Sequence, residues 1–173
     1  MAYDLHCNSC PYFQQRHLLG AFQTGRNFPP VELESHGSST LLVFQAPGDI
    51  EWAVGKAIQP TKKPGGTAGV RILNSWCRKG RTREDFDIIN AVQCFPGNNG
   101  DRDFKPLSDA QVCCAKRLNG ILEQGTYREI IAFGGVAFET VNSLLCGSDI
   151  SSKLIQVAHP NSGIPNSTLD SLW

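Results

Sequence analysis

The stretch TLLVF, Thr40 to Phe44, is a short and nearly continuous apolar run. Three later stretches have the same character: Phe86–Val92, Glu129–Phe133 and Lys153–Ala158. They are rich in Ile, Val and Phe and are nearly continuous rather than alternating. Because a strand that is covered on both faces needs apolar side chains on both, this pattern predicts the buried strands of a parallel sheet.

Helical patterns between these runs predict the helices that connect them. The three candidates are Thr67–Trp76, Ser108–Glu123 and Gly135–Leu145. The second opens on a predicted capping box, in which Ser108 and Gln111 satisfy each other's exposed N–H groups. Strands that alternate with helices predict a three-layer α/β/α fold, with a central sheet of four mostly parallel strands.

The length of 173 residues predicts a single domain over residues 1–173 with a sizeable core. No apolar run approaches the roughly 20 residues that are needed to span a membrane. The N-terminus, MAYDLHCNSC, has neither the basic nor the apolar region of a secretory signal. We therefore expect a cytoplasmic protein without a membrane partner, and a monomer.

The formal net charge is zero, which does not by itself indicate a nucleic-acid-binding protein. The distribution of charge is more informative, because the segment from Lys56 to Arg83 carries eight basic residues and no acidic one. Such a block can neutralise phosphates along one face. Without other evidence, a solvated basic surface is the favoured interpretation.

Seven cysteines, an odd number without a secretion signal, argue against a disulfide framework. Clustered cysteines in the cytoplasm more often hold metal. Cys7 and Cys10 form a CxxC motif, and Cys94 lies just past the second predicted strand. Cys113 and Cys114 are neighbours on a predicted helix. On a helical wheel Cys114 falls at the edge of the apolar face, whereas Cys113 points roughly opposite.

The resulting set, Cys7, Cys10, Cys94 and Cys114, suits zinc and an iron–sulfur cluster equally well by ligand type. The spacing does not decide between them. Four unconnected buried thiols are the weaker alternative, because the chain around a CxxC motif near a terminus usually needs a crosslink, such as a bound metal, to be ordered. Cys77 and Cys146 have no partner at a ligand spacing, and we interpret them as structural or incidental.

Polar residues follow the predicted strands at their carboxyl ends. Gln45, Asp49 and Glu51 come after the first strand, Asn90 lies near the end of the second, and His159 follows the fourth. Open α/β sheets bind ligands outside the carboxyl ends of their strands. Taken singly, each residue has an ordinary explanation, such as a turn cap. Their shared placement favours one common site.

Four motifs occur in a fixed order: CNSC near the start, QAPGDIE after the first strand, NAVQCFPG after the second and HPNSG after the fourth. This ordered set resembles the uracil-DNA glycosylase superfamily, most closely the bacterial and archaeal family-four enzymes, which carry a [4Fe–4S] cluster. The resemblance covers nearly the whole chain. The helix SDAQVCC and the strand IIAFGG also fall where that family has its fourth cysteine and its third strand.

The resemblance implies a uracil-DNA glycosylase-like DNA glycosylase. Such an enzyme flips a pyrimidine out of single- or double-stranded DNA and hydrolyses its N-glycosidic bond, which leaves an abasic site. Bond breakage produces an oxocarbenium-like sugar and a base anion. Preorganised hydrogen-bond donors stabilise the anion, and a carboxylate supports the sugar cation and orients water. A flipped base also requires a pocket, a wedge and groups that grip phosphates.

The resemblance also implies roles for individual residues. The cluster ligands would be Cys7, Cys10, Cys94 and Cys114. The catalytic residues would be Glu51 and Asp49, which orient water, Asn90, which reads the flipped base, and His159, which stabilises the leaving base. The base pocket would comprise Gln45, Ala46, Pro47, Gly48, Pro64 and Phe95. The DNA contacts would be Gly66, Thr67, Ser162, Lys62 and Lys63, with Ile164 as the wedge.

Two departures from the family pattern bear on the substrate. The family motif GEAPG is FQAPG here, so that Gln45 replaces a carboxylate. The family motif GRPFVGxAG is TKKPGGTAG here, with Pro64 in place of the aromatic residue that stacks on uracil. Trp52 or Phe95 is then the candidate for stacking. Because the amide of Asn90 pairs with uracil in one orientation and with cytosine in the other, either base fits it.

Uracil and a bulky modified cytosine therefore both stay open as substrates. The first corresponds to DNA repair. The second corresponds to anti-phage defence, in which a glucosylated hydroxymethylcytosine of phage DNA would be excised. Two further classes are a catalytically inactive, cluster-bearing DNA-binding protein, with Gln45 as the inactivating change, and a zinc-stapled α/β enzyme that acts on another nucleotide.

Overall fold

A computed structural model describes residues 5–13, 28–60, 67–100 and 103–173 of the chain. Its core is one four-stranded sheet in which all neighbouring strands are parallel. The strands, in their order across the sheet, are β2 (Asp87–Asn90), β1 (Thr40–Phe44), β3 (Glu129–Phe133) and β4 (Lys153–Val157).

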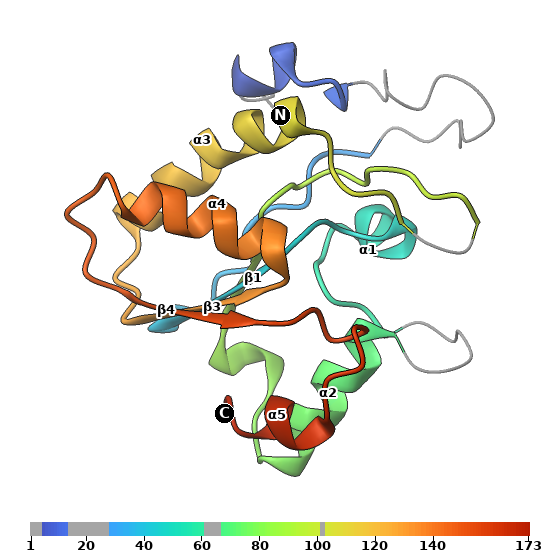
Figure 1. The fold of residues 1–173 in the computed structure, drawn as a ribbon, viewed down its shortest axis with the longest axis vertical. Coiled ribbons are helices and arrows are strands. Elements are labelled where there is room, and N and C mark those ends of the chain that lie inside the picture. The colour runs from blue at the N-terminus through green and yellow to red at the C-terminus, as the bar shows by residue number, and fades with distance from the viewer. Residues whose placement is uncertain (1–4, 14–27, 61–66, 101–102) are drawn as a thin grey trace.

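Five α-helices are present in the described parts of the chain, together with two short 3₁₀ helices. The α-helices are α1 (Asp49–Val54), α2 (Ala68–Arg78), α3 (Ser108–Gln124), α4 (Gly135–Leu145) and α5 (Asn166–Asp170), and the 3₁₀ helices are η1 (Leu5–Ser9) and η3 (Arg83–Asp85). Figure 1 shows α3 and α4 on one side of the sheet and α2 and α5 on the other. None of these helices is long and apolar enough to cross a membrane.

Successive residues of the strands pack against opposite helix layers. In β1, Leu42 and Phe44 belong to a buried cluster that includes the α2 residue Ile72, whereas Leu41 and Val43 pack with residues of α3 and α4. Both faces of the sheet are thus buried, which explains why the strands have continuous rather than alternating apolar sequences. The predicted three-layer α/β/α fold is confirmed.

Several element boundaries match the sequence predictions, including the start of α3 at Ser108, but the predicted capping of this helix does not. Leu107 is the N-cap of this helix, and Ser108 is its first helical residue. The backbone N–H of Gln111 donates to the carbonyl of Leu107 at 3.0 Å, and Nε2 of Gln111 donates to the carbonyl of Pro106 at 2.8 Å. The predicted capping box between Ser108 and Gln111 is therefore wrong.

Helix α1 follows directly from the Pro47-Gly48 turn and has no counterpart in the predicted elements. The backbone N–H of Gly48 donates to Oε2 of Glu51 at 2.7 Å, which satisfies one of the free donors at the start of the helix. Asp49 and Glu51 also place negative charge in the first turn, where the helix dipole favours it. The helix ends at Gly55, whose φ of 76° is the left-handed conformation of a glycine C-cap.

Candidate active site

Gln45, Asn90 and His159 lie at or just beyond the carboxyl edge of the sheet, which we define as the edge where the strands end at Asn90, Phe44, Phe133 and Val157. From β1 the chain continues to β2 on one side, and from β3 it continues to β4 on the other. The adjacent strands β1 and β3 therefore form the topological switch point, outside which open α/β sheets bind ligands. Gln45 follows β1 at this point, and Gly134 follows β3.

Asn90 is the last residue of β2 and pairs in register with Phe44 of β1. The ring of Phe44 in turn stacks on Phe133, with 4.5 Å between the centroids and 3° between the planes. Asn90 is 1% exposed, and its Nδ2 has no hydrogen-bond partner among the described residues. Since a buried donor without a partner costs about 1–3 kcal/mol, this amide has a donor available for an acceptor on a ligand.

His159 lies two residues beyond β4 and packs over Gly134, where an added Cβ would lie 3.8 Å from the Cβ of His159. Its Nδ1 is 3.2 Å from the backbone N–H of Asn161, which places the proton of the neutral ring on Nε2. Burial lowers the pKa of His159 below its usual value. At neutral pH the ring is therefore a neutral donor through Nε2.

Ser162 and Thr67, both predicted phosphate contacts, make hydrogen bonds within the protein. The hydroxyl of Ser162 donates to the carbonyl of His159 at 2.6 Å and closes the turn that follows β4. The hydroxyl of Thr67 accepts the N–H of Val70 at 3.4 Å and caps α2. Ile164, the predicted wedge, packs partly against the core.

Glu51 is held by backbone donors on two sides. Its Oε2 accepts the N–H of Gly48 at 2.7 Å, and its Oε1 accepts the N–H of Gln59 at 3.0 Å. Burial raises the pKa of Glu51, and the nearby carboxylate of Asp103 also raises it. A Cβ added to Gly48 would lie 3.5 Å from Oε2 of Glu51 and 3.6 Å from Oδ2 of Asp103, so both carboxylates border this glycine.

Asp103 is thus a candidate functional residue that no sequence motif pointed to. It reaches Gly48 because the loop after β2 folds back on itself, with a bridge between Asn98 and Asp103. Asp49, the other predicted carboxylate, is half-buried in the first turn of α1. Three carboxylates therefore lie near Gly48 and the start of α1: Glu51, Asp103 and Asp49.

The remaining pocket residues differ in their surroundings. The carbonyl of Gln45 accepts the N–H of Val92 at 3.0 Å, which extends the pairing of β1 with β2 past the strand ends. Trp52 and Phe95, the two candidates for stacking on a base, are both 2% exposed, with ring centroids 6.1 Å apart. Nε1 of Trp52 donates to the carbonyl of Pro29 at 3.0 Å. A stacking role for either ring stays a prediction.

Two more of the predicted pocket residues, Ala46 and Pro47, lie at the Pro47-Gly48 turn. Pro47 is buried, and Ala46 packs against the buried cluster that contains Cys10. Lys62, Lys63, Pro64 and Gly66 lie outside the described residues.

Three of the four predicted metal ligands meet in one place. Cys10 and Cys114 are buried in a small cluster together with Tyr12, and Cys94 packs against it. Cys7 lies on η1, and its carbonyl accepts the N–H of Cys10 at 3.0 Å. Figure 1 shows η1 against the start of α3.

Cys113 is a fifth thiol at this place, although the helical wheel placed it opposite the apolar face. It packs partly buried against the same cluster, and its Sγ lies 3.7 Å from Oγ of Ser9. We call Cys7, Cys10, Cys94, Cys113 and Cys114 the cysteine group.

Burial raises the pKa of three thiols in the cysteine group, those of Cys10, Cys94 and Cys114. The pKa of Cys114 is raised to about 12, and the pKa values of Cys10 and Cys94 are raised as well. Neighbouring thiols of the group add to this effect, so that several thiolates at this place require a bound cation. Four thiols match zinc and iron–sulfur clusters by donor type. In the described parts of the chain, however, no three His, Cys, Asp or Glu side chains form a ready metal-binding group.

Arg117 connects the cysteine group to Asn90 and was not found from the sequence. Its guanidinium donates to Oε1 of Gln93 at 3.1 Å, and Nε2 of Gln93 donates to the carbonyl of Asn90 at 3.3 Å. The positive charge of Arg117 also lowers the pKa values of Cys94 and Cys114, against the larger effect of burial. Arg117 thus interacts with Asn90 through Gln93 and with Cys94 and Cys114 through its charge.

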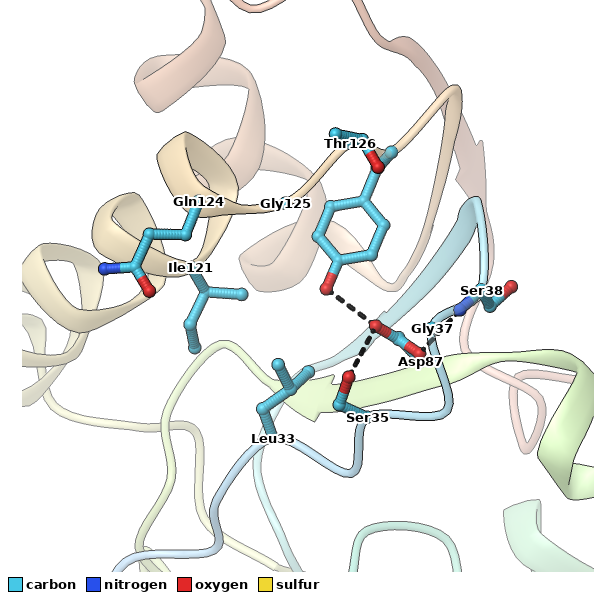
Figure 2. A pocket seen from close by; sticks show the side chains of 10 residues that line it. Leu33, Ser35, Gly37, Ser38, Asp87, Ile121, Gln124, Gly125 and Thr126 are labelled. Carbon is cyan, nitrogen blue, oxygen red and sulfur yellow. Dashed lines mark hydrogen bonds between the residues drawn. The ribbon is translucent and has the colours of Figure 1, made fainter.

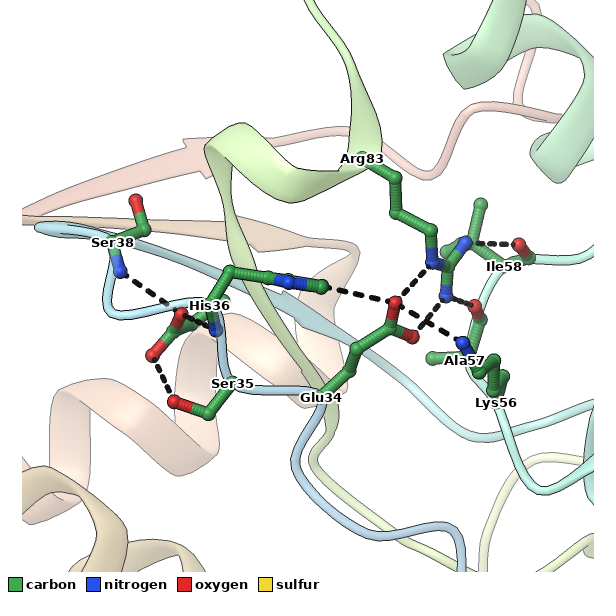
Figure 3. Close-up of polar contacts among 9 residues, drawn as sticks. Glu34, Ser35, His36, Ser38, Lys56, Ala57, Ile58 and Arg83 are labelled. Atoms are coloured by element: carbon green, nitrogen blue, oxygen red, sulfur yellow. Dashed lines mark hydrogen bonds and ion pairs between the residues drawn. The ribbon is translucent and has the colours of Figure 1, made fainter.

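The basic block contributes less to a phosphate-binding face than its composition indicated. Arg83 donates two 2.7 Å hydrogen bonds to Glu34 and also bonds the carbonyls of Ala57 and Ile58 (Figure 3). The hydrogen bonds from Arg83 lower the pKa of Glu34 to about 2. Arg78 binds Asp170. These arginines hold loops and helices of the protein together.

A cavity of about 300 Å³ lies at the opposite edge of the sheet, near Asp87 at the start of β2 (Figure 2). The carboxylate of Asp87 accepts the hydroxyls of Tyr127 and Ser35 and the N–H groups of His36 and Ser38. Burial acts to raise the pKa of Asp87, but these four hydrogen bonds lower it. Four donors of the protein thus satisfy the carboxylate of Asp87. We therefore interpret this buried carboxylate as structural.

Comparison with known proteins adds no relative. No protein-family model matches this sequence, and no curated protein matches it. Membership of the uracil-DNA glycosylase superfamily therefore stays a prediction from the four ordered motifs.

Proposed function

We propose that this protein is a DNA glycosylase, which flips a pyrimidine nucleotide out of DNA and hydrolyses the bond between base and deoxyribose. The observation that carries the proposal is the buried amide of Asn90, whose Nδ2 has no partner in the described structure. It lies at the edge of the sheet where α/β proteins bind ligands. A carboxamide at such a position can pair with the Watson–Crick edge of a flipped pyrimidine.

His159 would stabilise the leaving base. As the bond between C1′ and the base breaks, its electron pair moves onto the base, which becomes an anion. A neutral imidazole whose Nδ1 already accepts the N–H of Asn161 donates Nε2–H to that anion. Because the ring is held in place before the reaction, little reorganisation is needed when the charge develops.

Glu51 and Asp103 would act on the water. The carboxylate of Glu51 accepts the N–H groups of Gly48 and Gln59 and a further backbone hydrogen bond from Ile58, which leaves it a lone pair for a water proton. The water oxygen bonds to C1′ of the sugar cation, and its proton passes to a carboxylate. The neighbouring charge of Asp103 raises the proton affinity of Glu51 and so supports it as a base.

The substrate is a uracil or a modified cytosine. In one orientation, Nδ2 of Asn90 donates to O4 of uracil and Oδ1 accepts N3–H. In the other, Nδ2 donates to N3 of cytosine and Oδ1 accepts from the amino group. The replacement of a family carboxylate by Gln45 favours a changed substrate, so that excision of bulky modified cytosines from phage DNA is the alternative to uracil repair.

We further propose that Cys7, Cys10, Cys94 and Cys114 hold a [4Fe–4S] cluster. This proposal is supported by the packing of Cys10, Cys94 and Cys114 in one buried cluster. Cys7 lies one helical turn before Cys10, whose N–H donates to its carbonyl. The bound cluster would supply a covalent staple between η1, the loop after β2 and α3. It would take no part in breaking the bond to the base.

The test is incubation of the purified protein with uracil-containing DNA and with glucosylated hydroxymethylcytosine DNA, followed by alkaline cleavage of abasic sites. We expect cleavage of at least one DNA by the wild type. We expect a loss of at least about 100-fold in Asn90→Ala and in His159→Ala, which is typical for removing a transition-state donor. The exposed α4 residue Asn142 gives the matched control Asn142→Ala. Binding without cleavage of either DNA would instead identify an inactive DNA-binding protein.

A further inference from the structure

The segment that follows β4 carries His159 and Ile164, and helix α2 holds it in place. Arg71 lies in the first turn of α2, and its guanidinium donates to the carbonyls of Pro160 and Ile164. It also donates to Oδ1 of Asn166 at 3.0 Å. One side chain thus binds both ends of the turn 160–164 and the start of α5.

The other hydrogen bonds of this turn are internal to it. The N–H of Asn161 donates to Nδ1 of His159, and the N–H of Ser162 donates to the carbonyl of His159 at 2.8 Å. Gly163 has a φ of 82°, which allows the tight reversal. Within the described residues, Arg71 therefore provides the hydrogen bonds that join the turn to another part of the fold.

Arg71 is one of three polar residues on one face of α2 that hydrogen-bond to the segment from Pro160 to Trp173. Ser75 and Arg78, four and seven residues further on, lie on the same face of the helix. Both bind the carboxylate of Asp170, and the hydroxyl of Ser75 also accepts the indole N–H of Trp173 at 2.8 Å. The three residues have two separate functions, because Arg71 holds the turn whereas Ser75 and Arg78 hold α5.

We propose that Arg71 is a positioning residue, which fixes the turn 160–164 so that His159 and Ile164 are presented at the carboxyl edge of the sheet. The consequence for activity rests on the proposed function, whereas the effect on the turn does not. A planar guanidinium suits this task, since its five N–H donors fan out in a fixed fork and can serve three acceptors at once.

The competing role for Arg71 is a phosphate contact, as its place in the basic block suggested. The two roles differ in their measurable consequences. Loss of a phosphate contact weakens DNA binding and reduces the slope of log K against log salt by about 0.9. Loss of a positioning residue leaves that slope unchanged and lowers kcat, because the donor on His159 is no longer held in place.

The test compares Arg71→Met with Arg78→Met by hydrogen exchange of the Asn161 and Ser162 amides, followed by NMR. Arg78→Met is the matched control, since it removes an arginine on the same face of α2, one that binds α5 and not the turn. We expect exchange at both amides to accelerate at least about tenfold in Arg71→Met, because charged hydrogen bonds close the turn. We expect unchanged exchange in Arg78→Met.

Unchanged exchange in Arg71→Met, or equal acceleration in both variants, overturns the proposal. If Arg71→Met does not fold, Arg71→Lys decides, because lysine keeps the charge and the aliphatic stem but not the fork. We then expect faster exchange at the turn in Arg71→Lys alone, and wild-type exchange there would equally refute the proposal.

Assays with DNA separate the proposal for Arg71 from the proposed function. If the wild type excises a base, Arg71→Met should lower kcat while the affinity for DNA and its salt slope stay at wild-type values. A lower salt slope would assign Arg71 to phosphate binding instead. If the wild type excises no base from any DNA, the glycosylase proposal fails, whereas the exchange measurement still decides whether Arg71 holds the turn.

Discussion

Asn90 lies beside Phe44 in the register of the two neighbouring strands, at the point where both strands end. Phe44 stacks on Phe133, whereas the buried amide of Asn90 has a donor without a partner among the described residues. A polar group of this kind lowers the stability of a sheet, and the proposed role in binding a base would explain its presence.

Replacing Asn90 by leucine should therefore separate stability from function. Leucine has a similar volume and leaves no unpaired donor. We expect the free energy of unfolding to stay the same or to rise by up to about 2 kcal/mol, while base excision is lost. Urea denaturation together with the abasic-site assay measures both. A destabilisation of about 3 kcal/mol or more would mean that the amide is needed by the fold itself.

The pKa of His159 should lie below 6.5, because burial disfavours the charged ring. The unfolded chain then binds a proton at a higher pH than the folded chain. This group consequently has no effect on stability well above pH 6.5, and stability falls as the pH drops from about 6.5 through the folded pKa. An NMR titration of the ring, with His159→Gln to assign it, tests this expectation. A midpoint at or above 6.5 speaks against the neutral donor.

The pKa of Glu51 should fall when its neighbour loses its charge. In Asp103→Asn the like charge near Gly48 is gone, whereas burial of Glu51 persists, so that the pKa stays above its usual value but by less. Because a raised folded pKa makes stability decline as the pH rises from about 4.5 through that pKa, Asp103→Asn should reduce this decline. Carboxyl NMR titrations of both proteins provide the measurement, and an unmoved Glu51 would show that the two carboxylates do not interact.

Iron binding should distinguish Cys114 from its neighbour Cys113. We expect an oxygen-free preparation of the wild type to contain iron and to absorb in the visible range, and we expect Cys114→Ala to lose both. Cys113→Ala and Cys77→Ala should keep them. Iron and zinc analysis of the four proteins is decisive, since a colourless wild type that contains zinc would exclude the [4Fe–4S] cluster.

The ion pair between Arg83 and Glu34 should contribute to stability in a pH-dependent way. The two side chains are 16% and 12% exposed, and Arg83 also binds the carbonyls that precede Gln59. We expect Arg83→Met to lower the free energy of unfolding at pH 7 by about 2 kcal/mol. Since the pKa of Glu34 is lowered to about 2, its contribution is present above about pH 4.5 and is lost as the pH falls towards 2. An equal loss at pH 3 and pH 7 would contradict this origin.

The strands and long helices could be predicted because their patterns are local. TLLVF and the Gly135–Leu145 helix have the bounds that their apolar residues indicate. Helix α1 could not be predicted in this way, since six residues are too short for a periodic pattern. It depends instead on the hydrogen bond between Gly48 and Glu51. The predicted cap at Ser108 was wrong, because Leu107 is the N-cap and its carbonyl accepts the N–H of Gln111.

The missed site residues have long-range partners. Asp103 approaches Glu51 from a distant loop, and Arg117 reaches Gln93 across 24 residues. Arg71 binds carbonyls about 90 residues away. Its membership of the basic block could not predict this contact. Residue type and spacing could predict that polar groups gather at the carboxyl edge. Which side chains are already bound by the protein follows only from the folded structure.

We propose that the amide of Asn90 hydrogen-bonds to a flipped base, which the protein then cleaves from the DNA. The most direct measurement is mass spectrometry of the free base released from uracil-containing DNA and from glucosylated hydroxymethylcytosine DNA. We predict that the wild type and Asn142→Ala release one of these bases, and that Asn90→Ala releases at least about 100-fold less. No free base from either DNA, or undiminished release by Asn90→Ala, would contradict it.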